Sequence, residues 1–144
     1  MKRFFTSGIL LLITLTIYAQ DARSLIKEGI QLSNTKDYTA AIEKFRSALA
    51  FEPGNISANY QMAYTLNAQG KGTEAIPYLQ KVIAQNTADA ITAASYALMG
   101  SIYDRTNQPQ KAIESFNSAL KMAPSDYLLH YNLGLTYFRT RQYA

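Results

Sequence analysis

The sequence contains no cysteine and no tryptophan, and His130 is its single histidine. Without cysteine the fold can hold no disulfide and must rely on packing, even in an oxidising compartment. The same absence excludes a cysteine nucleophile and a lipid-modified N-terminal cysteine. An ordinary zinc site takes three or four ligands from cysteine, histidine and carboxylate side chains, so we expect no metal centre and no cofactor.

Positive charge is present but is not clustered. The chain carries 14 Lys and Arg against 10 Asp and Glu, a formal net charge of +4. Lys2 and Arg3 account for two of these cations, and the rest are interspersed with acidic residues in runs no longer than a pair. A protein surface that follows nucleic-acid phosphates needs clustered Lys and Arg. We therefore expect no nucleic-acid partner.

The N-terminal segment 1–19 has the plan of a secretory signal peptide. Lys2 and Arg3 precede an apolar stretch at 8–17, and Ala19 is a small residue at a plausible cleavage point. Such a stretch of about ten to fourteen residues is short for a bilayer, which needs about twenty. We predict cleavage after Ala19 and a periplasmic or secreted bacterial protein. Retention of the segment as a membrane anchor, with membrane contact through it alone, is the alternative.

One stretch of eighteen residues occurs twice. Residues 38–55 read YTAAIEKFRSALAFEPGN and residues 109–126 read PQKAIESFNSALKMAPSD, with eight identities in an ungapped alignment. The offset is 71 residues, which is twice 34 plus three, and a third copy between them fits this period. A repeat of this length with one apolar stripe per helix predicts a helical solenoid, whose usual work is to hold other proteins.

The repeats resemble the tetratricopeptide repeat, in which a large residue, Leu-Gly and Tyr are followed by Ala, an aromatic residue and Pro. The best copy matches this pattern at eight positions: Tyr96, Met99, Gly100, Tyr103, Ala112, Phe116, Ala119 and Pro124. The resemblance covers a domain at 20–144, with repeats at about 22–55, 56–89 and 93–126 and a partial fourth at 127–144. It implies an all-α fold, a right-handed superhelical solenoid of antiparallel helix pairs.

The same phasing predicts seven helices, at about 22–34, 38–51, 56–69, 73–86, 90–106, 109–122 and 126–140. A small residue takes one register position in each first helix, where it lets the partner helix approach closely: Gly29, Ala63, Gly100 and Gly134. Three extra residues fall at 86–90. They should lengthen either a loop or the helix that follows, and the alanine-rich sequence there favours the helix.

No catalytic motif is visible. His130 occupies the packing position that Leu25 and Tyr96 hold in other repeats, so we interpret it as a partly buried structural residue rather than half of a Ser–His pair. Gly70 and Gly72 lack the strand–helix context of a phosphate loop and indicate a turn between helices. We expect no enzyme activity and no small-molecule substrate.

In the family that this chain resembles, the first helices of successive repeats line a concave groove that accepts a peptide or partner helix. By register, six residues are candidate contacts there: Tyr60, Tyr64, Asn67, Asp104, Arg105 and Tyr131. Tyrosine offers a large contact area with a polar tip. Structural packing between helices stays open as the alternative for Tyr60 and Tyr64.

One subclass of the family grips a C-terminal carboxylate with Lys, Arg and Asn side chains. The corresponding positions here hold Ile26, Ile30, Gln61, Ala94 and Leu98. None of these is a cation, so the resemblance implies no such clamp. The groove is instead aromatic and mildly polar, which favours an apolar or tyrosine-complementary segment in the partner.

The predicted helix at 126–140 is apolar on nearly every side. A terminal solenoid helix normally shows a polar outer face. We therefore expect either that the chain continues beyond Ala144 or that another molecule, including a second copy, covers this helix. The function we infer is an exported, non-catalytic scaffold that binds a protein or peptide. The alternative is the sensor part of a longer membrane signalling protein truncated at Ala144.

Overall fold

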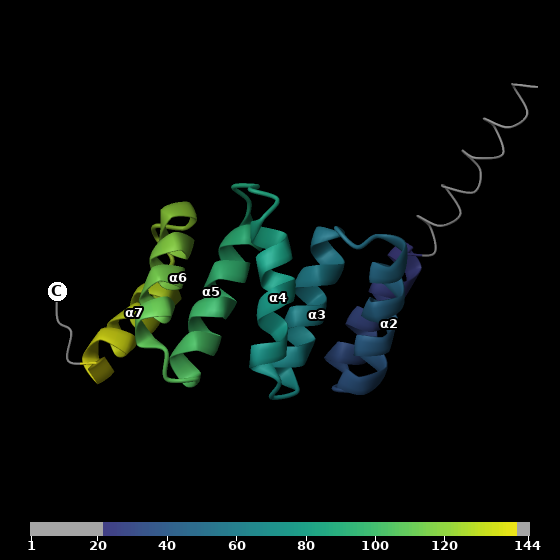
Figure 1. Ribbon diagram of the computed structural model, residues 1–144, viewed down its shortest axis with the longest axis horizontal. Coiled ribbons are helices and arrows are strands. Elements are labelled where there is room, and N and C mark those ends of the chain that lie inside the picture. The colour runs from purple at the N-terminus through teal and green to yellow at the C-terminus, as the bar shows by residue number, and fades with distance from the viewer. Residues whose placement is uncertain (1–21, 141–144) are drawn as a thin grey trace, which may run out of the picture.

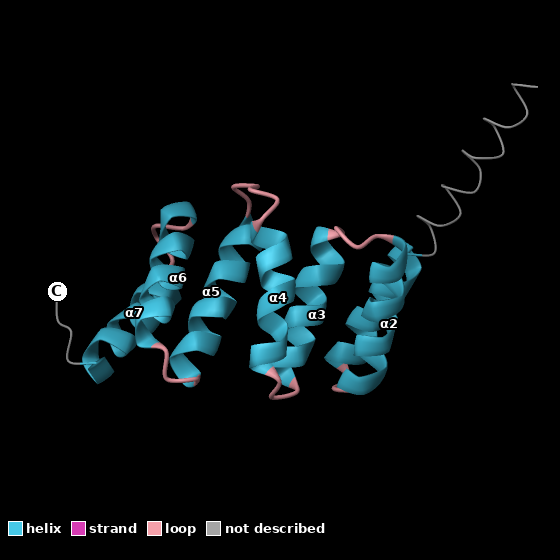
Figure 2. Cartoon of the chain, viewed as in Figure 1, coloured by secondary structure: helices cyan, strands magenta, loops and turns pink. Residues whose placement is uncertain are grey.

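The computed structural model describes residues 22–140, and all regular secondary structure within that range is α-helical. A helical segment at 22–34 is followed by α2 (Tyr38–Phe51), α3 (Ile56–Ala68), α4 (Gly72–Ile83), α5 (Ala90–Arg105), α6 (Pro109–Met122) and α7 (Tyr127–Thr140). The helices stand side by side in one extended row, joined by short loops (Figures 1 and 2). The predicted all-α repeat fold is confirmed, and the predicted helix bounds agree to within three residues.

The predicted signal peptide at 1–19 lies outside the described residues. Among the helices inside them, none combines the length and the apolar character needed to cross a bilayer.

Helices pack against their neighbours in the row. Consecutive helices from α2 to α7 contact each other, and so do α3 with α5 and α5 with α7. Within the described residues the second helices of the repeats, α2, α4 and α6, do not approach one another closely. The first helices therefore form the tighter inner row, and the second helices are spread apart on the outer side.

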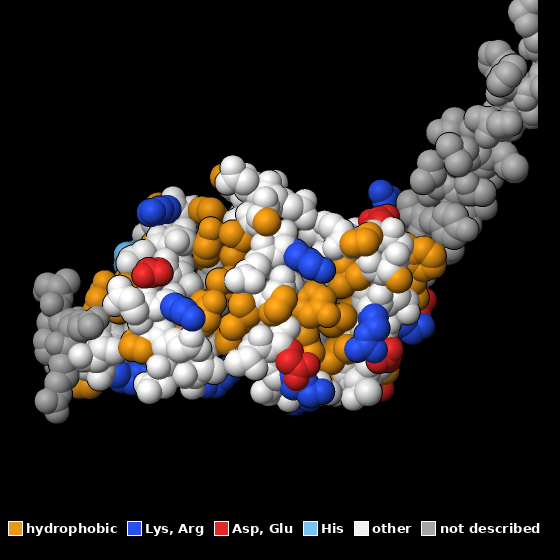
Figure 3. Space-filling view, in the orientation of Figure 1, with side chains coloured by type: hydrophobic (Ala, Val, Ile, Leu, Met, Phe, Trp, Pro, Cys, Tyr) orange, Lys and Arg blue, Asp and Glu red, His pale blue; other side chains and the backbone are white. Residues whose placement is uncertain are grey.

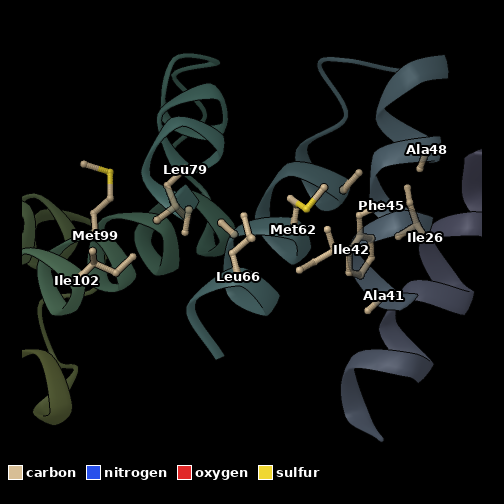
Figure 4. Close-up of a cluster of buried hydrophobic side chains, with 13 residues drawn as sticks. Ile26, Ala41, Ile42, Phe45, Ala48, Met62, Leu66, Leu79, Met99 and Ile102 are labelled. Atoms are coloured by element: carbon tan, nitrogen blue, oxygen red, sulfur yellow. The ribbon is translucent and has the colours of Figure 1, made fainter. Parts of the chain in front are cut away.

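The main core lies between these two rows. Phe45 of α2, Met62 of α3 and Leu79 of α4 are almost completely buried and belong to one cluster that reaches Ile102 of α5 (Figure 4). A second cluster gathers around Phe116 of α6. Full burial of such side chains contributes roughly 1.5–3 kcal/mol each, so these two clusters replace the missing disulfides as the source of stability.

The small residue of each first helix admits a large side chain from the second helix. A Cβ atom at Gly29 would lie 2.6 Å from the ring of Phe45, and one at Gly100 would lie 2.7 Å from the ring of Phe116. Real Cβ atoms do not come this close, so glycine is what lets each ring lie against the helix backbone. In the middle repeat, Ala63 and Leu79 take the same register positions.

The extra residues of the third repeat extend α5. This helix has 16 residues, against 13 in α3 and 14 in α7. It begins ten positions before Gly100, whereas α7 begins seven positions before Gly134. The predicted lengthening is therefore confirmed. Asp89 caps the added turn, with its carboxylate accepting a hydrogen bond from the Thr92 N–H at 2.8 Å.

Candidate partner-binding surface

All six predicted contact residues lie on first helices. Tyr60, Tyr64 and Asn67 lie on α3, Asp104 and Arg105 on α5, and Tyr131 on α7. Five of the six form contacts within the chain. Tyr60 and Tyr64 stack on each other, and the three polar residues bond to side chains of neighbouring first helices.

Tyr60 and Tyr64 lie one turn apart on α3, and their rings stack. The ring centroids are 6.5 Å apart and the ring planes differ by 30°. Tyr60 is half-buried and packs against the main core, whereas the Tyr64 side chain is 50% exposed. Burial, with a smaller effect from Tyr64, raises the pKa of Tyr60. Tyr60 thus has the packing role that the sequence left open, and it supports Tyr64 as the accessible ring.

The polar candidates are engaged within the chain. The Asn67 side-chain oxygen accepts a hydrogen bond from the guanidinium of Arg105, which links α3 to α5. Asp104 accepts a hydrogen bond from the Thr136 hydroxyl at 2.9 Å and forms an ion pair with Arg139, which links α5 to α7. These three residues therefore fix the spacing of the first helices. A ligand that used the Asp104 carboxylate would compete with these bonds.

Sequence reasoning missed Thr136 and the pairing of Arg139 with Asp104. Thr136 is fully buried, and the Arg139 side chain is about half exposed. A signal for Thr136 was available, because it lies 71 residues after Thr65, the same offset that separates the two duplicated segments. No comparable signal exists for Arg139, since its partner is set by the distance between two helices.

Tyr131 lies in the largest group of exposed apolar side chains. It is 62% exposed, and its neighbours on α7 are exposed as well: Tyr127, Leu128, Leu135 and Phe138. The predicted apolar character of the last helix is confirmed on its surface, because only Leu129 and Thr136 of α7 are buried.

Hollows on the outer side form a second concave feature. One of about 420 Å³ has Met62 and Leu66 in its lining, and one of about 330 Å³ has Met99 and Tyr103 at the equivalent positions of the next repeat. In the second, the Lys111 ammonium lies 5.4 Å from the centre of the Tyr103 ring. Figure 3 shows one face of the molecule, on which apolar side chains gather over the middle of the row with Lys and Arg among them.

Residues 22–140 bring together no group of three or more His, Asp and Glu side chains that could hold a metal ion. His130 is exposed, and its Nε2 lies 2.8 Å from the carbonyl oxygen of Pro124. The expectation of a partly buried histidine was therefore wrong. The reason is that α6 covers the equivalent Tyr96, whereas no described helix covers this side of α7.

The tetratricopeptide repeat family model matches residues 55–125. Among solved structures, MamA from Desulfovibrio magneticus RS-1 (residues 41 to the end) is 31% identical, with a TM-score of 0.78 over 85% of this chain and 67% of that chain. The first tetratricopeptide domain of Spaghetti (RPAP3), bound to HSP90 peptide SRMEEVD, has a TM-score of 0.79 over 85% of this chain and 94% of its own. At 16% identity, this second likeness shows the fold alone.

Among curated proteins, human protein O-mannosyl-transferase TMTC1 is 25% identical over 108 residues, which is 75% of this chain and 12% of that protein. The chain spans between 12% and 24% of the length of the curated relatives it matches. The family match, the internal 34-residue period and the likeness to the MamA structures all indicate the same helical repeat. The chain belongs to the tetratricopeptide repeat family.

Proposed function

We propose that this protein is an exported, non-catalytic scaffold that binds a segment of another protein on its first-helix face. The observation that carries the proposal is Tyr64, an exposed aromatic ring on α3 that stacks on the half-buried Tyr60. A ring held in this way loses little conformational entropy on binding, which suits a contact that contributes strongly to affinity.

The candidate contacts divide by role. Tyr64 and Tyr131 present large accessible surfaces to a partner. Asn67, Asp104 and Arg105 hold the neighbouring helices in place, and the exposed Arg105 guanidinium keeps further donors for a partner carbonyl or carboxylate. The structure of the RPAP3 domain with a peptide supports the proposal at the level of the fold.

A displayed library of random 12-residue peptides, panned against the wild-type protein, tests the groove. We expect Tyr64→Ala to weaken the selected peptides by roughly tenfold or more, as for an aromatic residue at the centre of an interface. Tyr127→Ala is the control, since it removes a still more exposed tyrosine outside the predicted contacts. Helical content and melting should change little in both variants. Equal binding to wild type and Tyr64→Ala, or failure to select any peptide, would contradict the proposal.

Export rests on the basic and apolar sequence before Ala19 and has its own test. The intact mass of the native protein is measured separately in soluble periplasmic, membrane and cytoplasmic fractions. A soluble periplasmic species that begins at Gln20 is the expected result. A species that retains the N-terminal segment in the membrane fraction would favour the sensor alternative, and a full-length cytoplasmic species would refute export.

A further inference from the structure

The larger outer hollow lies between α2 and α4, on the opposite side of the row from Tyr64. We call it the α2–α4 hollow. Its volume of about 420 Å³ falls in the range of sites that take a small apolar group, roughly 300–1,000 Å³. Its floor is apolar, with Met62 and Leu66 of α3 and Ile42 of α2 in the lining. On the face drawn in Figure 3, apolar side chains gather between α4 and α2 with Lys and Arg beside them.

Two cations lie on opposite walls of this hollow, Arg46 on α2 and Lys81 on α4. By the 34-residue period, Lys81 corresponds to Ser47, one position after Arg46, so the two cations lie at nearly the same level of neighbouring repeats. The Arg46 guanidinium pairs with Glu43, and the Lys81 ammonium lies 5.6 Å from the centre of the Tyr78 ring. A carboxylate placed between the walls would meet both cations.

The other end of the α2–α4 hollow carries negative charge. Glu74 lies seven residues before Lys81, which is about 10 Å along α4. The hollow therefore has a positive end, a negative end and an apolar floor. This distribution of charge favours a bound segment whose acidic side chain lies near Lys81 and away from Glu74.

Pro77 makes the α4 wall apolar. The equivalent positions of α2 and α6 hold Glu43 and Glu114. Proline at the sixth residue of α4 gives up the helical hydrogen bond to the Thr73 carbonyl, which disfavours the helix. Its exposed ring takes the place of a carboxylate that would repel an acidic ligand.

The outer hollow of the third repeat has a different charge pattern, although Met99 and Tyr103 match Met62 and Leu66 of the floor. Ser118 stands at the position of Lys81, and Lys111 stands at the position of Glu74. The opposed cations therefore belong to the α2–α4 hollow and are not a general consequence of the repeat.

We propose that the α2–α4 hollow is a second docking site, for a short segment of a partner protein that carries one large apolar side chain and an acidic residue beside it. The apolar side chain fills the hollow over Met62 and Leu66, and the carboxylate lies between Arg46 and Lys81. A basic segment meets repulsion at the same place. Because this site is on the outer side, a partner held on the first-helix face leaves it accessible.

The probe is the displayed library of random 12-residue peptides, panned against Tyr64→Ala, which keeps the α2–α4 hollow and lacks the exposed ring of the other site. We expect the selected peptides to share an aliphatic or aromatic residue with Asp or Glu within three positions of it. Lys81→Ser should weaken their binding by roughly fivefold, as for a partly exposed ion pair. Lys121→Ser is the matched control, an exposed lysine of α6 outside both outer hollows. In 0.5 M NaCl most of the effect of Lys81→Ser should disappear.

Pro77→Glu separates docking from folding. It introduces the residue that α2 and α6 carry at this position and returns a helical N–H, so the melting temperature should hold or rise. The added carboxylate should weaken binding of the selected peptides by roughly tenfold or more, because like charges then face each other across the site. Pro77→Ala, which adds no charge, should leave binding near that of the parent protein.

Three results would overturn the proposal. In the first, no peptide is selected, or none loses more affinity in Lys81→Ser than in Lys121→Ser. In the second, Pro77→Ala weakens binding as much as Pro77→Glu, which would mean that charge does not select the ligand. In the third, sedimentation shows a wild-type dimer that Lys81→Ser dissociates and that the peptides do not compete with, which would assign the hollow to self-association. Peptides of the first-helix face depend on Tyr64 and not on Lys81, so the two sites fail separately.

Discussion

The hydroxyl groups of Ser33 and Thr65 lie 3.0 Å apart in a buried hydrogen bond that joins the helical segment 22–34 to α3. The two positions 71 residues later are Asp104 and Thr136, which form the same link between α5 and α7 at 2.9 Å. In α5, the position that corresponds to Thr65 of α3 and Thr136 of α7 is occupied by Ile102, which cannot form this hydrogen bond. The helices α3 and α5 are joined instead by the hydrogen bond between Asn67 and Arg105. The duplicated sequence has therefore kept a duplicated polar contact.

Removing both partners of this buried pair should cost less than the two single removals added together. Ser33→Ala leaves the Thr65 hydroxyl buried without this partner, and we expect a loss of about 1–3 kcal/mol in the free energy of unfolding. Ser33→Ala combined with Thr65→Val should cost less than the sum of the single changes. Urea unfolding measures this, with Ser47→Ala, exposed and bonded only within its own helix, as the control. Strict additivity would show that the two hydroxyls are not coupled.

Gly100→Ala should destabilise the third repeat by about 1–3 kcal/mol, because the added methyl group overlaps the Phe116 ring. Phe116→Leu in the same chain should recover part of this loss, since it recreates the Ala63 and Leu79 pair. The matched control is Gly134→Ala, which meets nothing and should stabilise by roughly 0.5–1 kcal/mol. Thermal unfolding of the wild type and the three variants measures these changes. A loss of stability in Gly134→Ala equal to that in Gly100→Ala would refute the explanation that the Phe116 ring requires glycine at position 100.

Asn55 caps α3, with its side-chain oxygen accepting a hydrogen bond from the Ala58 N–H at 2.9 Å. Asn55→Ala should lower the free energy of unfolding by about 0.5–2 kcal/mol, because that N–H has no partner in the first turn of the helix. The Asn55 side-chain nitrogen also donates a hydrogen bond to the Glu52 carboxylate at 2.7 Å. The comparison is therefore Asn55→Ser, which keeps a capping acceptor without adding a charge beside Glu52 and should cost less. Denaturant unfolding compares the two, and equal losses would show that the cap bond is not the cause.

The Glu28 carboxylate and the Lys44 ammonium lie 2.6 Å apart across the two helices of the first repeat. The hydrogen bond from Lys44, aided by its charge, lowers the pKa of Glu28 in the folded protein. Stability from this pair is therefore present above the ordinary glutamate pKa and is lost as the pH falls through the lowered value. The difference in melting temperature between wild type and Glu28→Gln should shrink from pH 7 toward pH 3.

Salt provides the control for this ion pair. Both side chains are partly exposed, so 1 M NaCl at pH 7 should reduce the same difference by screening. A difference between wild type and Glu28→Gln that is independent of both pH and salt would show that Glu28 acts through packing alone.

The helices could be predicted because their determinants are local and repeated. The phenylalanines and alanines of α2 and α6 mark one face, and Pro109 starts α6 where its missing N–H costs nothing. The end of α4 was predicted three residues too late. Asn86 adopts a left-handed φ of 53°, which asparagine tolerates, and the chain leaves the helix before it.

The candidate surface could be predicted only in part. The stacking of Tyr60 on Tyr64 follows from their spacing of one helical turn. The bond between Asn67 and Arg105 could not be anticipated, since it depends on how closely α3 and α5 lie. The outer hollows escaped prediction for a similar reason, because they arise from the spread of the second helices rather than from any single segment.

The arrangement of the helices in a single row also determines how the protein unfolds. From α2 to α7, helices touch only the next helix or the next but one, so no contact ties one end of the row to the other. Such proteins have low contact order and nearly independent repeats. We expect amide hydrogen exchange to be slowest in α3 and α5, which have neighbours on every side, and to quicken toward α7. The row should fray from its end while its middle stays closed.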